Sequence, residues 1–319
     1  MSQTDAKAAP GGESLFTVLL ALAMNAAIAV AKSVAAVLTG SASMVAEAAH
    51  SWADTGNEIF LLQAERRGAR PPDASHPLGY GRDAYVWSMF AAVGLFAAGS
   101  MVSIWHGITT WGERGGADYL VNYVVLGLAF VLEGISFRQA VKQTRGEATR
   151  WGLRPATFLY RTSNPTLRAV FMEDAAALIG ILLAAAGVFL HQVTGDGRWD
   201  SAGSIAVGLL LGVIAVFLIQ RNRAFLIGKP VWPALHNRVL ARLMARESVS
   251  RVTQLRLEVV GPTRFFMVAA VDIVGNLPES ELALTLRSLE REIEEQETIA
   301  DAVLTLSTPD EPSLAPLPE

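Results

Sequence analysis

The chain carries six long apolar segments separated by short polar ones. Each is close to the ~20 residues that a helix needs to cross the hydrocarbon core of a bilayer. They are Leu15–Leu38, Ser43–Ala64, Tyr85–Trp111, Tyr119–Phe137, Leu167–Leu190 and Ala202–Ile219. The second is the least apolar of the six, so a hydropathy window alone can miss it. The pattern predicts six transmembrane helices.

From Pro233 onward the pattern becomes that of a soluble domain. A helix, two strands joined by a turn, a charged helix and a third strand are predicted at Ala234–Arg246, Gln254–Val260, Arg264–Val274, Pro278–Gln296 and Asp301–Ser307. We therefore expect an α-helical membrane protein with six transmembrane helices, followed by a small α+β domain of αββαβ, ferredoxin-like order. The expected divisions are a disordered N-terminus (1–13), the membrane domain (14–225), the αββαβ domain (230–308) and a proline-rich disordered tail (309–319).

Basic residues gather in alternate loops. The loops after the second, fourth and sixth segments are rich in arginine and lysine, whereas the opposite loops carry only Arg114 and Arg198. By the positive-inside rule both termini and the αββαβ domain are expected in the cytoplasm. The rule does not separate a bacterial inner membrane from that of an organelle; the expected location is a bacterial inner membrane.

Composition excludes several classes of function. The chain is 51% hydrophobic with a mean hydropathy of +0.35, which is too apolar for an ordinary soluble protein. A net charge of −4 without a basic face argues against nucleic acid. Cysteine is absent from the sequence, so a metal would have to be held by oxygen and nitrogen. No phosphate-binding Gly-x-x-x-x-Gly-Lys-Ser/Thr sequence occurs, which argues against nucleotide.

The second segment carries a polar stripe. Glu47, His50, Asp54 and Glu58 are spaced by three, four and four residues, so they share one face of a helix. Each ionisable group near mid-membrane costs about 2.5–3.5 kcal/mol, so such a stripe indicates a cavity, a partner charge or a bound ion. The pair His50 and Asp54 is within reach of a single cation; the alternative is a polar pair packed against a neighbouring helix. Glu47 and Glu58 are expected to be water-accessible vestibule groups rather than ligands.

The fifth segment holds the adjacent carboxylates Glu173 and Asp174. Neighbouring residues diverge by ~100° on a helix, so only one can face the site squarely. Asp54 is expected ~16 Å below the outer surface and Asp174 ~14 Å above the inner one. These depths sum to the ~30 Å thickness of the hydrocarbon core, which puts both carboxylates at one height.

Two further polar features have alternative interpretations. Asp73 and His76, beside the sequence His76–Arg82, form either a weak ion site in the first cytoplasmic loop or a structural cap on the third segment. Lys32 in the first segment is expected to extend its amine toward the outer surface.

Several of these features together resemble the cation diffusion facilitator family. They are the six-span plan, His50-x-x-x-Asp54, the His76–Arg82 motif, Asp200 opening span six, and Gly261–Phe265 in the αββαβ domain. The likeness covers about residues 14–308. It implies a homodimeric metal/proton antiporter, not an enzyme, that exports zinc or a related divalent ion and dimerises through its cytoplasmic domain and membrane helices.

The sequence departs from the family pattern at three places. Val170 stands where span five usually offers a ligand four residues before Asp174. That leaves His50, Asp54 and Asp174, with Glu173 or Glu47 as a possible fourth ligand. Tyr80 replaces a second loop histidine, and the positions near Ala269 and Leu306 are apolar where the family has cytoplasmic zinc ligands. We therefore expect a dimer-forming domain that does not sense metal, in a divergent branch known in bacteria and animal mitochondria.

The expected function is export of Zn²⁺, bound by His50, Asp54 and Asp174, in exchange for a proton carried by His50. The same ligands accept Mn²⁺, Fe²⁺ or Co²⁺. A non-transporting metal-binding membrane scaffold is the alternative from another class. An intramembrane metalloenzyme is not favoured, because no HExxH motif supplies a general base beside a metal.

Overall fold

The computed structural model describes residues 13–113 and 119–318. The predicted disordered N-terminus, residues 1–13, lies outside this part of the chain except for Glu13, at which α1 begins. The chain divides into two compact units. The first comprises Met1–Ile59, Ala91–Ala140 and Phe171–Phe217, and the second comprises Phe60–Phe90, Val141–Val170 and Leu218–Glu319.

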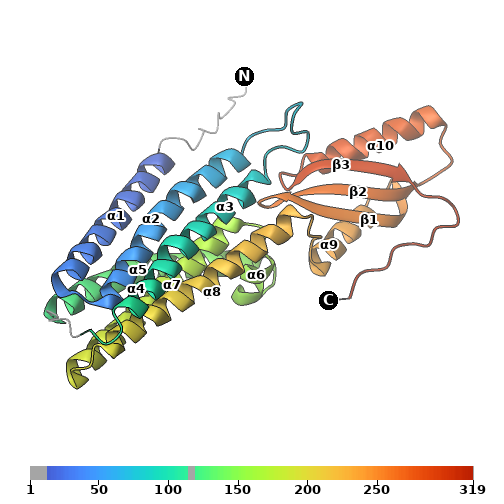
Figure 1. The fold of residues 1–319 in the computed structure, drawn as a ribbon. Coiled ribbons are helices and arrows are strands. Elements are labelled where there is room, and N and C mark those ends of the chain that lie inside the picture. Colours follow the sequence, from blue (N-terminus) through green and yellow to red (C-terminus); the bar gives the residue numbers. More distant parts are fainter. Residues whose placement is uncertain (1–12, 114–118, 319) are drawn as a thin grey trace. The chain divides into compact units, whose positions relative to one another are not determined.

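Long helices occupy all six predicted apolar segments (Figure 1). They are α1 (Glu13–Thr39), α2 (Ala42–Gly68), the continuous run of α3 (Asp83–Gly94), η1 (Leu95–Met101) and α4 (Val102–Thr109), α5 (Tyr119–Arg150), α7 (Pro165–Thr194) and α8 (Arg198–Leu226). Within the described residues, four of these runs are long and apolar enough to cross a membrane, namely those at 83–109, 119–150, 165–194 and 198–226. The chain is thus a multi-pass membrane protein, while the count of six spans stays a prediction.

Two helical features differ from the expected boundaries. Helix α5 continues to Arg150 rather than ending near Phe137, because the polar residues that follow favour a helix and include no proline. A short helix, α6 (Pro155–Arg161), begins with proline at its first turn and interrupts a stretch that we expected to be loop.

Close helix packing in the first unit depends on small residues. The π-helix η1 and helix α4 lie against α8. A Cβ atom added to Gly208 would lie 2.7 Å from Cγ1 of Ile104, and one added to Gly107 would lie 2.8 Å from Cγ1 of Ile205. The widened turn of η1 places Gly99 beside Leu211 of α8 and near Ala53 of α2. The third span therefore packs closely against α8.

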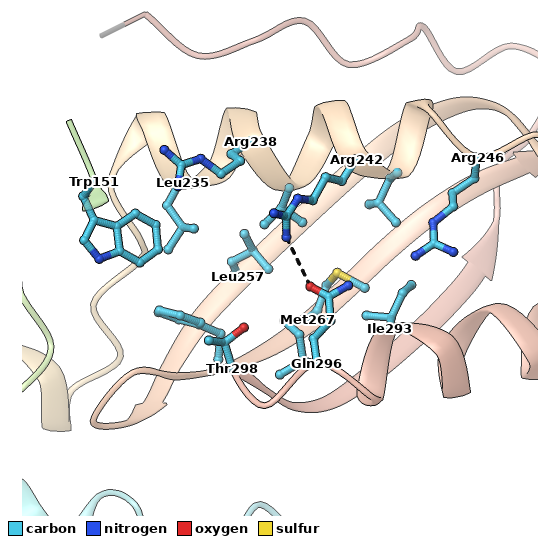
Figure 2. Close-up of a pocket in the computed structure, with 14 residues that line it drawn as sticks. Trp151, Leu235, Arg238, Arg242, Arg246, Leu257, Met267, Ile293, Gln296 and Thr298 are labelled. Carbon is cyan, nitrogen blue, oxygen red and sulfur yellow. Dashed lines mark hydrogen bonds between the residues drawn. The ribbon is translucent and has the colours of Figure 1, made fainter. Parts of the chain in front are cut away.

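The C-terminal domain has the predicted αββαβ order (Figure 1). Its elements are α9 (Pro233–Met244), β1 (Val249–Gly261), β2 (Arg264–Ile273), α10 (Glu279–Glu294) and β3 (Ile299–Leu306). The sheet order is β1-β2-β3, with β1 antiparallel and β3 parallel to β2. Alternate residues of β2 (Phe265, Met267, Ala269, Val271) are buried in one core with leucines of α9 and α10 and with Ile293 of α10. This apolar core leaves one cavity between the two helices (Figure 2).

The tail after β3 differs from the expected disorder. The backbone N–H of Leu314 donates to the carbonyl of Val252 over 2.7 Å, and the guanidinium of Arg251 donates to the carbonyls of Thr308 and Glu311. Leu314 also packs against the core of the domain. One half-buried leucine and several hydrogen bonds hold the segment, and its prolines lower the entropy that ordering removes.

Candidate metal site

The spacing of the stripe on α2 brings His50 and Asp54 together. Nε2 of His50 lies 3.4 Å from Oδ2 of Asp54, with the imidazole fully buried and the carboxylate 18% exposed. The contact lacks hydrogen-bond geometry, so both ring nitrogens and Oδ1 of Asp54 are buried without a hydrogen-bond partner among the described residues. These atoms are free to bind a cation or a proton.

Other polar atoms near this pair are also unpaired. Within the described chain, buried oxygens without a hydrogen-bond partner include Oγ of Ser51, Oδ1 of Asn57, Oε2 of Glu58 and Oε1 of Glu173. More than about 90% of buried polar groups in proteins are paired, so a concentration of exceptions on one helix calls for an explanation. One explanation is that these atoms bind a hydrophilic cargo that enters and leaves the protein.

The two carboxylates of α7 diverge as adjacent helical residues must. Glu173 is buried and accepts a hydrogen bond from Nδ2 of Asn57 on α2. Asp174 accepts one from Oγ of Ser136 on α5, over 2.9 Å. Glu173 therefore joins α7 to α2 one turn from Asp54. In the described residues, no three His, Asp or Glu side chains converge closely enough to hold a metal ion, so His50, Asp54 and Asp174 do not form one cluster here.

Lys32 and Glu47 differ from what the sequence led us to expect. Nζ of Lys32 lies 2.8 Å from Oε2 of Glu47, and both side chains are completely buried. Lys32 thus does not reach the outer surface, and Glu47 is not a water-accessible vestibule group. The physical reason is that a carboxylate on the neighbouring helix offers the amine a partner at its own depth. Gly180 leaves room for Glu47, since a Cβ atom there would lie 2.8 Å from Oε1.

Asp200, which the sequence singled out only as part of a motif, fixes the start of α2. Its carboxylate accepts hydrogen bonds from the backbone N–H groups of Ala42 and Ser43, over 2.5 and 3.2 Å, and from the hydroxyl of Ser41 over 2.9 Å. An acidic side chain at a helix N-terminus satisfies free N–H groups and complements the helix dipole. Asp200 of α8 therefore helps to set the position of the stripe on α2.

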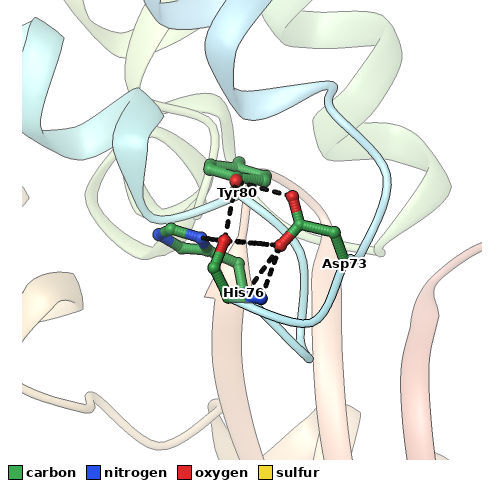
Figure 3. A network of polar contacts seen from close by, with 4 residues as sticks. Asp73, His76 and Tyr80 are labelled. Carbon is green, nitrogen blue, oxygen red and sulfur yellow. Dashed lines mark hydrogen bonds and ion pairs between the residues drawn. The ribbon is translucent and has the colours of Figure 1, made fainter.

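The loop residues Asp73 and His76 form a compact exposed network (Figure 3). The Asp73 carboxylate accepts hydrogen bonds from the hydroxyls of Ser75 and Tyr80, over 2.6 and 2.7 Å, and from the backbone N–H of His76 over 2.9 Å. These bonds from Ser75 and Tyr80 hold the pKa of Asp73 below its usual range. The His76 ring stacks on Tyr80 with 3.9 Å between centroids. The geometry favours a structural role over an ion site, because the carboxylate already accepts several hydrogen bonds. These bonds lie within residues 73–80 and order the loop itself, whereas the predicted cap on the third segment would require a bond to α3.

The same loop is attached to the C-terminal domain within the second unit. Arg82 forms an ion pair with Glu258 of β1. A Cβ atom on Gly81 would lie 2.6 Å from the carbonyl oxygen of Val260, so only glycine allows this approach. Gly81 of the loop motif therefore serves a backbone contact that the sequence alone did not reveal.

Comparison with known proteins agrees with the resemblance. The cation efflux transmembrane domain matches residues 18–227. Metal tolerance protein C4 of Arabidopsis thaliana is 36% identical over 235 residues, 73% of this chain and 51% of that protein. The human protein named proton-coupled zinc antiporter SLC30A9, mitochondrial, is 31% identical over 261 residues, 82% of this chain and 46% of that protein.

A more distant relative is similar in length to this chain. The manganese efflux system protein MneP of Bacillus subtilis is 22% identical over 244 residues, 75% of this chain and 77% of that protein. By contrast, the chain spans about half the length of the first two relatives. The family model, at residues 18–227, covers the segments predicted to span the membrane.

Proposed function

Since the chain belongs to the cation diffusion facilitator family of metal transporters, which are not enzymes, we propose that it exchanges Zn²⁺ for protons. The observation that carries this proposal is the buried pair His50–Asp54 with its unpaired nitrogen and oxygen atoms. Zn²⁺ prefers imidazole nitrogen and carboxylate oxygen when thiolates are absent. The relatives named as proton-coupled zinc antiporters support the choice of ion and counter-ion.

The proposed site uses His50 and Asp54 from α2, completed by a carboxylate from α7. Asp174 is the family-type ligand and Glu173 the alternative. Glu173 is hydrogen-bonded to Asn57 and has a second oxygen without a partner in the described chain. In the proposed cycle, a movement of α7 against α2 brings one of these carboxylates to the ion. The transporter would thus bind metal in one state and release it in another.

Proton exchange follows from the imidazole. A neutral His50 ring ligates Zn²⁺, whereas a protonated ring has no lone pair to offer. Protonation on one side of the membrane therefore expels the metal, and deprotonation on the other side restores the site. The proposed direction is export from the cytoplasm of a bacterial cell, with both termini on the cytoplasmic side and two copies forming the transporter.

Manganese, iron or cobalt is the second candidate substrate. Val170 removes a nitrogen ligand, which shifts preference toward harder ions, and one relative is named a manganese efflux protein. We expect the Val170→His variant to gain zinc over manganese in a metal panel, because it restores the missing donor. If the variant and the wild type have the same selectivity for zinc over manganese, position 170 does not determine which ion is transported.

The direct test is metal-driven proton flux in proteoliposomes with a trapped pH dye. His50→Ala and Asp54→Asn should each lower the zinc-driven signal at least tenfold, since each removes a ligand. Asp174→Asn and Glu173→Gln, compared side by side, identify the carboxylate from α7. Asp196→Asn, an exposed residue of a polar turn, is the matched control. Wild-type flux in both α2 variants would reject the site, and zinc binding without flux in the wild type would favour the scaffold alternative.

A further inference from the structure

The C-terminal domain contains a cavity of about 160 Å³ that opens between α9 and α10 (Figure 2). Its floor is apolar and comes from the sheet, through Leu257, Phe265 and Met267. Leu235 and Ile293 line it from the two helices. Protein cores are normally packed like molecular crystals, with few voids larger than a water molecule. This cavity would hold about five waters at ~30 Å³ each, yet its floor offers them almost nothing to bind.

Three arginines line its edge (Figure 2). Arg238 and Arg242 are four residues apart on α9, so they share one side of the helix, and Arg246 lies in the turn that follows the helix. Arg246 forms an ion pair with Glu292 of α10. Arg242 reaches only the amide oxygen of Gln296, over 3.4 Å, and Arg238 lies over the Trp151 ring, 5.0 Å from its centre.

Two of the three guanidinium groups therefore lack a counter-charge. In the part of the chain that the structure describes, neither Arg238 nor Arg242 has a carboxylate within 4.0 Å. Arginine presents a planar fork of donors that suits carboxylate and phosphate groups. Ligand sites are typically apolar pockets with a few convergent polar groups, and this cavity has that character.

We propose that this cavity binds an anionic amphiphile, with the end of an acyl chain on the apolar floor and an acidic head group on Arg242 and Arg238. The volume suits part of a medium-length chain rather than a whole lipid. The head group can be the carboxylate of a free fatty acid or the phosphate of an acidic membrane lipid, because both match the arginine fork. The inference is independent of the ion that the membrane helices transport.

The primary test is calorimetric titration of octanoate into the full-length protein in nanodiscs of zwitterionic lipid. Octanol, with the same chain and no charge, is the paired probe. Octanoate should bind saturably and at least tenfold more tightly than octanol, because only the acid engages the arginines. Equal affinity for the two probes, or no saturable binding of octanoate, would overturn the proposal.

Variants separate the head group from the chain. Arg242→Gln should weaken octanoate at least tenfold, whereas Arg291→Gln, an exposed arginine of α10 away from the cavity, should leave it unchanged. Val239→Phe fills the cavity mouth from a half-buried position and should abolish binding. Circular dichroism spectra confirm that each variant is folded. A similar loss in both arginine variants would indicate non-specific charge attraction and contradict the site.

Competition identifies the source of the head group. Displacement of octanoate by short-chain phosphatidylglycerol, but not by the matching phosphatidylcholine, would assign the cavity to an acidic membrane lipid. Failure of both lipids to compete, with octanoate still bound, would assign it to a single-chain carboxylate.

Discussion

The polar stripe of α2 and the C-terminal domain differ in whether their buried polar side-chain atoms have hydrogen-bond partners. In the domain, the buried Glu290 accepts a hydrogen bond from the backbone of Leu304 and pairs with Arg287. None of the unpaired buried side-chain atoms found in the described chain falls within residues 233–318. On α2 such atoms occur on Glu47, His50, Ser51, Asp54, Asn57 and Glu58.

We interpret this difference as a separation between a part of the chain that serves stability and the stripe proposed to serve transport. A buried polar atom without a partner costs roughly 1–3 kcal/mol, so a chain retains several of them only where something else provides a partner. Among the described residues of the domain, buried polar side-chain atoms have hydrogen-bond partners, which contributes to its stability. The unpaired atoms of the α2 stripe match the needs of a cargo that enters and leaves.

The strongest test of this contrast is the Lys32–Glu47 pair, a buried ion pair in which Oε2 of Glu47 has a counter-charge while Oε1 has no hydrogen-bond partner in the described chain. Lys32→Met leaves Glu47 buried without a counter-charge, in a position of zero exposure. Removing one partner of a buried ion pair costs about 3–5 kcal/mol. We expect a large drop in the thermal unfolding midpoint of the detergent-solubilised protein, followed by tryptophan fluorescence.

The matched control for that variant is Lys32→Met combined with Glu47→Met. Replacing both charges removes the uncompensated carboxylate, and such replacements are often neutral or stabilising. The double variant should therefore recover most of the lost stability. A Lys32→Met variant as stable as the wild type would mean that Lys32 and Glu47 do not form a buried ion pair. Water would then reach Glu47, and the polar stripe of α2 would be more solvated than the structure shows.

A smaller effect is expected where the loop contacts the domain. Gly81→Ala forces a Cβ atom against the carbonyl of Val260 and should cost about 1–3 kcal/mol, as overpacking does. Gly146→Ala, in α5 with nothing within 4 Å, is the control and should stabilise the helix by about 0.5–1 kcal/mol. Urea unfolding of both variants measures the difference. Equal effects of the two substitutions would mean that the loop does not rest on β1.

The fold could be predicted where its cause is local. The αββαβ order follows from alternation, turn residues and a change in composition, and the structure confirms it. The helix in each apolar segment follows from length and hydropathy. Helix α6, the π-turn of η1 and the bound tail could not be predicted, because each depends on packing between segments far apart in the sequence.

In the candidate site, too, contacts within one helix could be predicted and contacts between helices could not. The approach of His50 to Asp54 follows from a spacing of four residues on one helix. The contacts Lys32–Glu47, Asn57–Glu173 and Asp200 with the start of α2 join different helices, and no spacing within one segment encodes them. The sequence therefore identified the candidate ligands but not the partners that occupy or orient them.

The smallest effect concerns Asp73. Its carboxylate already accepts hydrogen bonds, so it resembles the paired polar groups of the C-terminal domain rather than a metal ligand. Hydrogen bonds from Ser75 and Tyr80 hold the pKa of its carboxyl below the ordinary value, so the ionised form favours the ordered loop. This ordering is complete above the unfolded pKa, ~3.9, and is lost as pH falls through the lower pKa of the folded loop. Hydrogen exchange of residues 70–82, corrected for intrinsic rates, measures it.

Two variants decide what Asp73 does. Asp73→Asn should raise exchange modestly at neutral pH, because the amide accepts these hydrogen bonds less strongly than a carboxylate does. Tyr80→Phe keeps the ring that stacks on His76 but removes one donor, so it should move the loss of order to higher pH. Zinc should leave exchange unchanged in the wild type if Asp73 only orders the loop. Protection by zinc that disappears in Asp73→Asn would instead indicate that the loop binds metal through Asp73. The Asp73 carboxylate would then resemble the unpaired groups of α2 rather than the paired groups of the C-terminal domain.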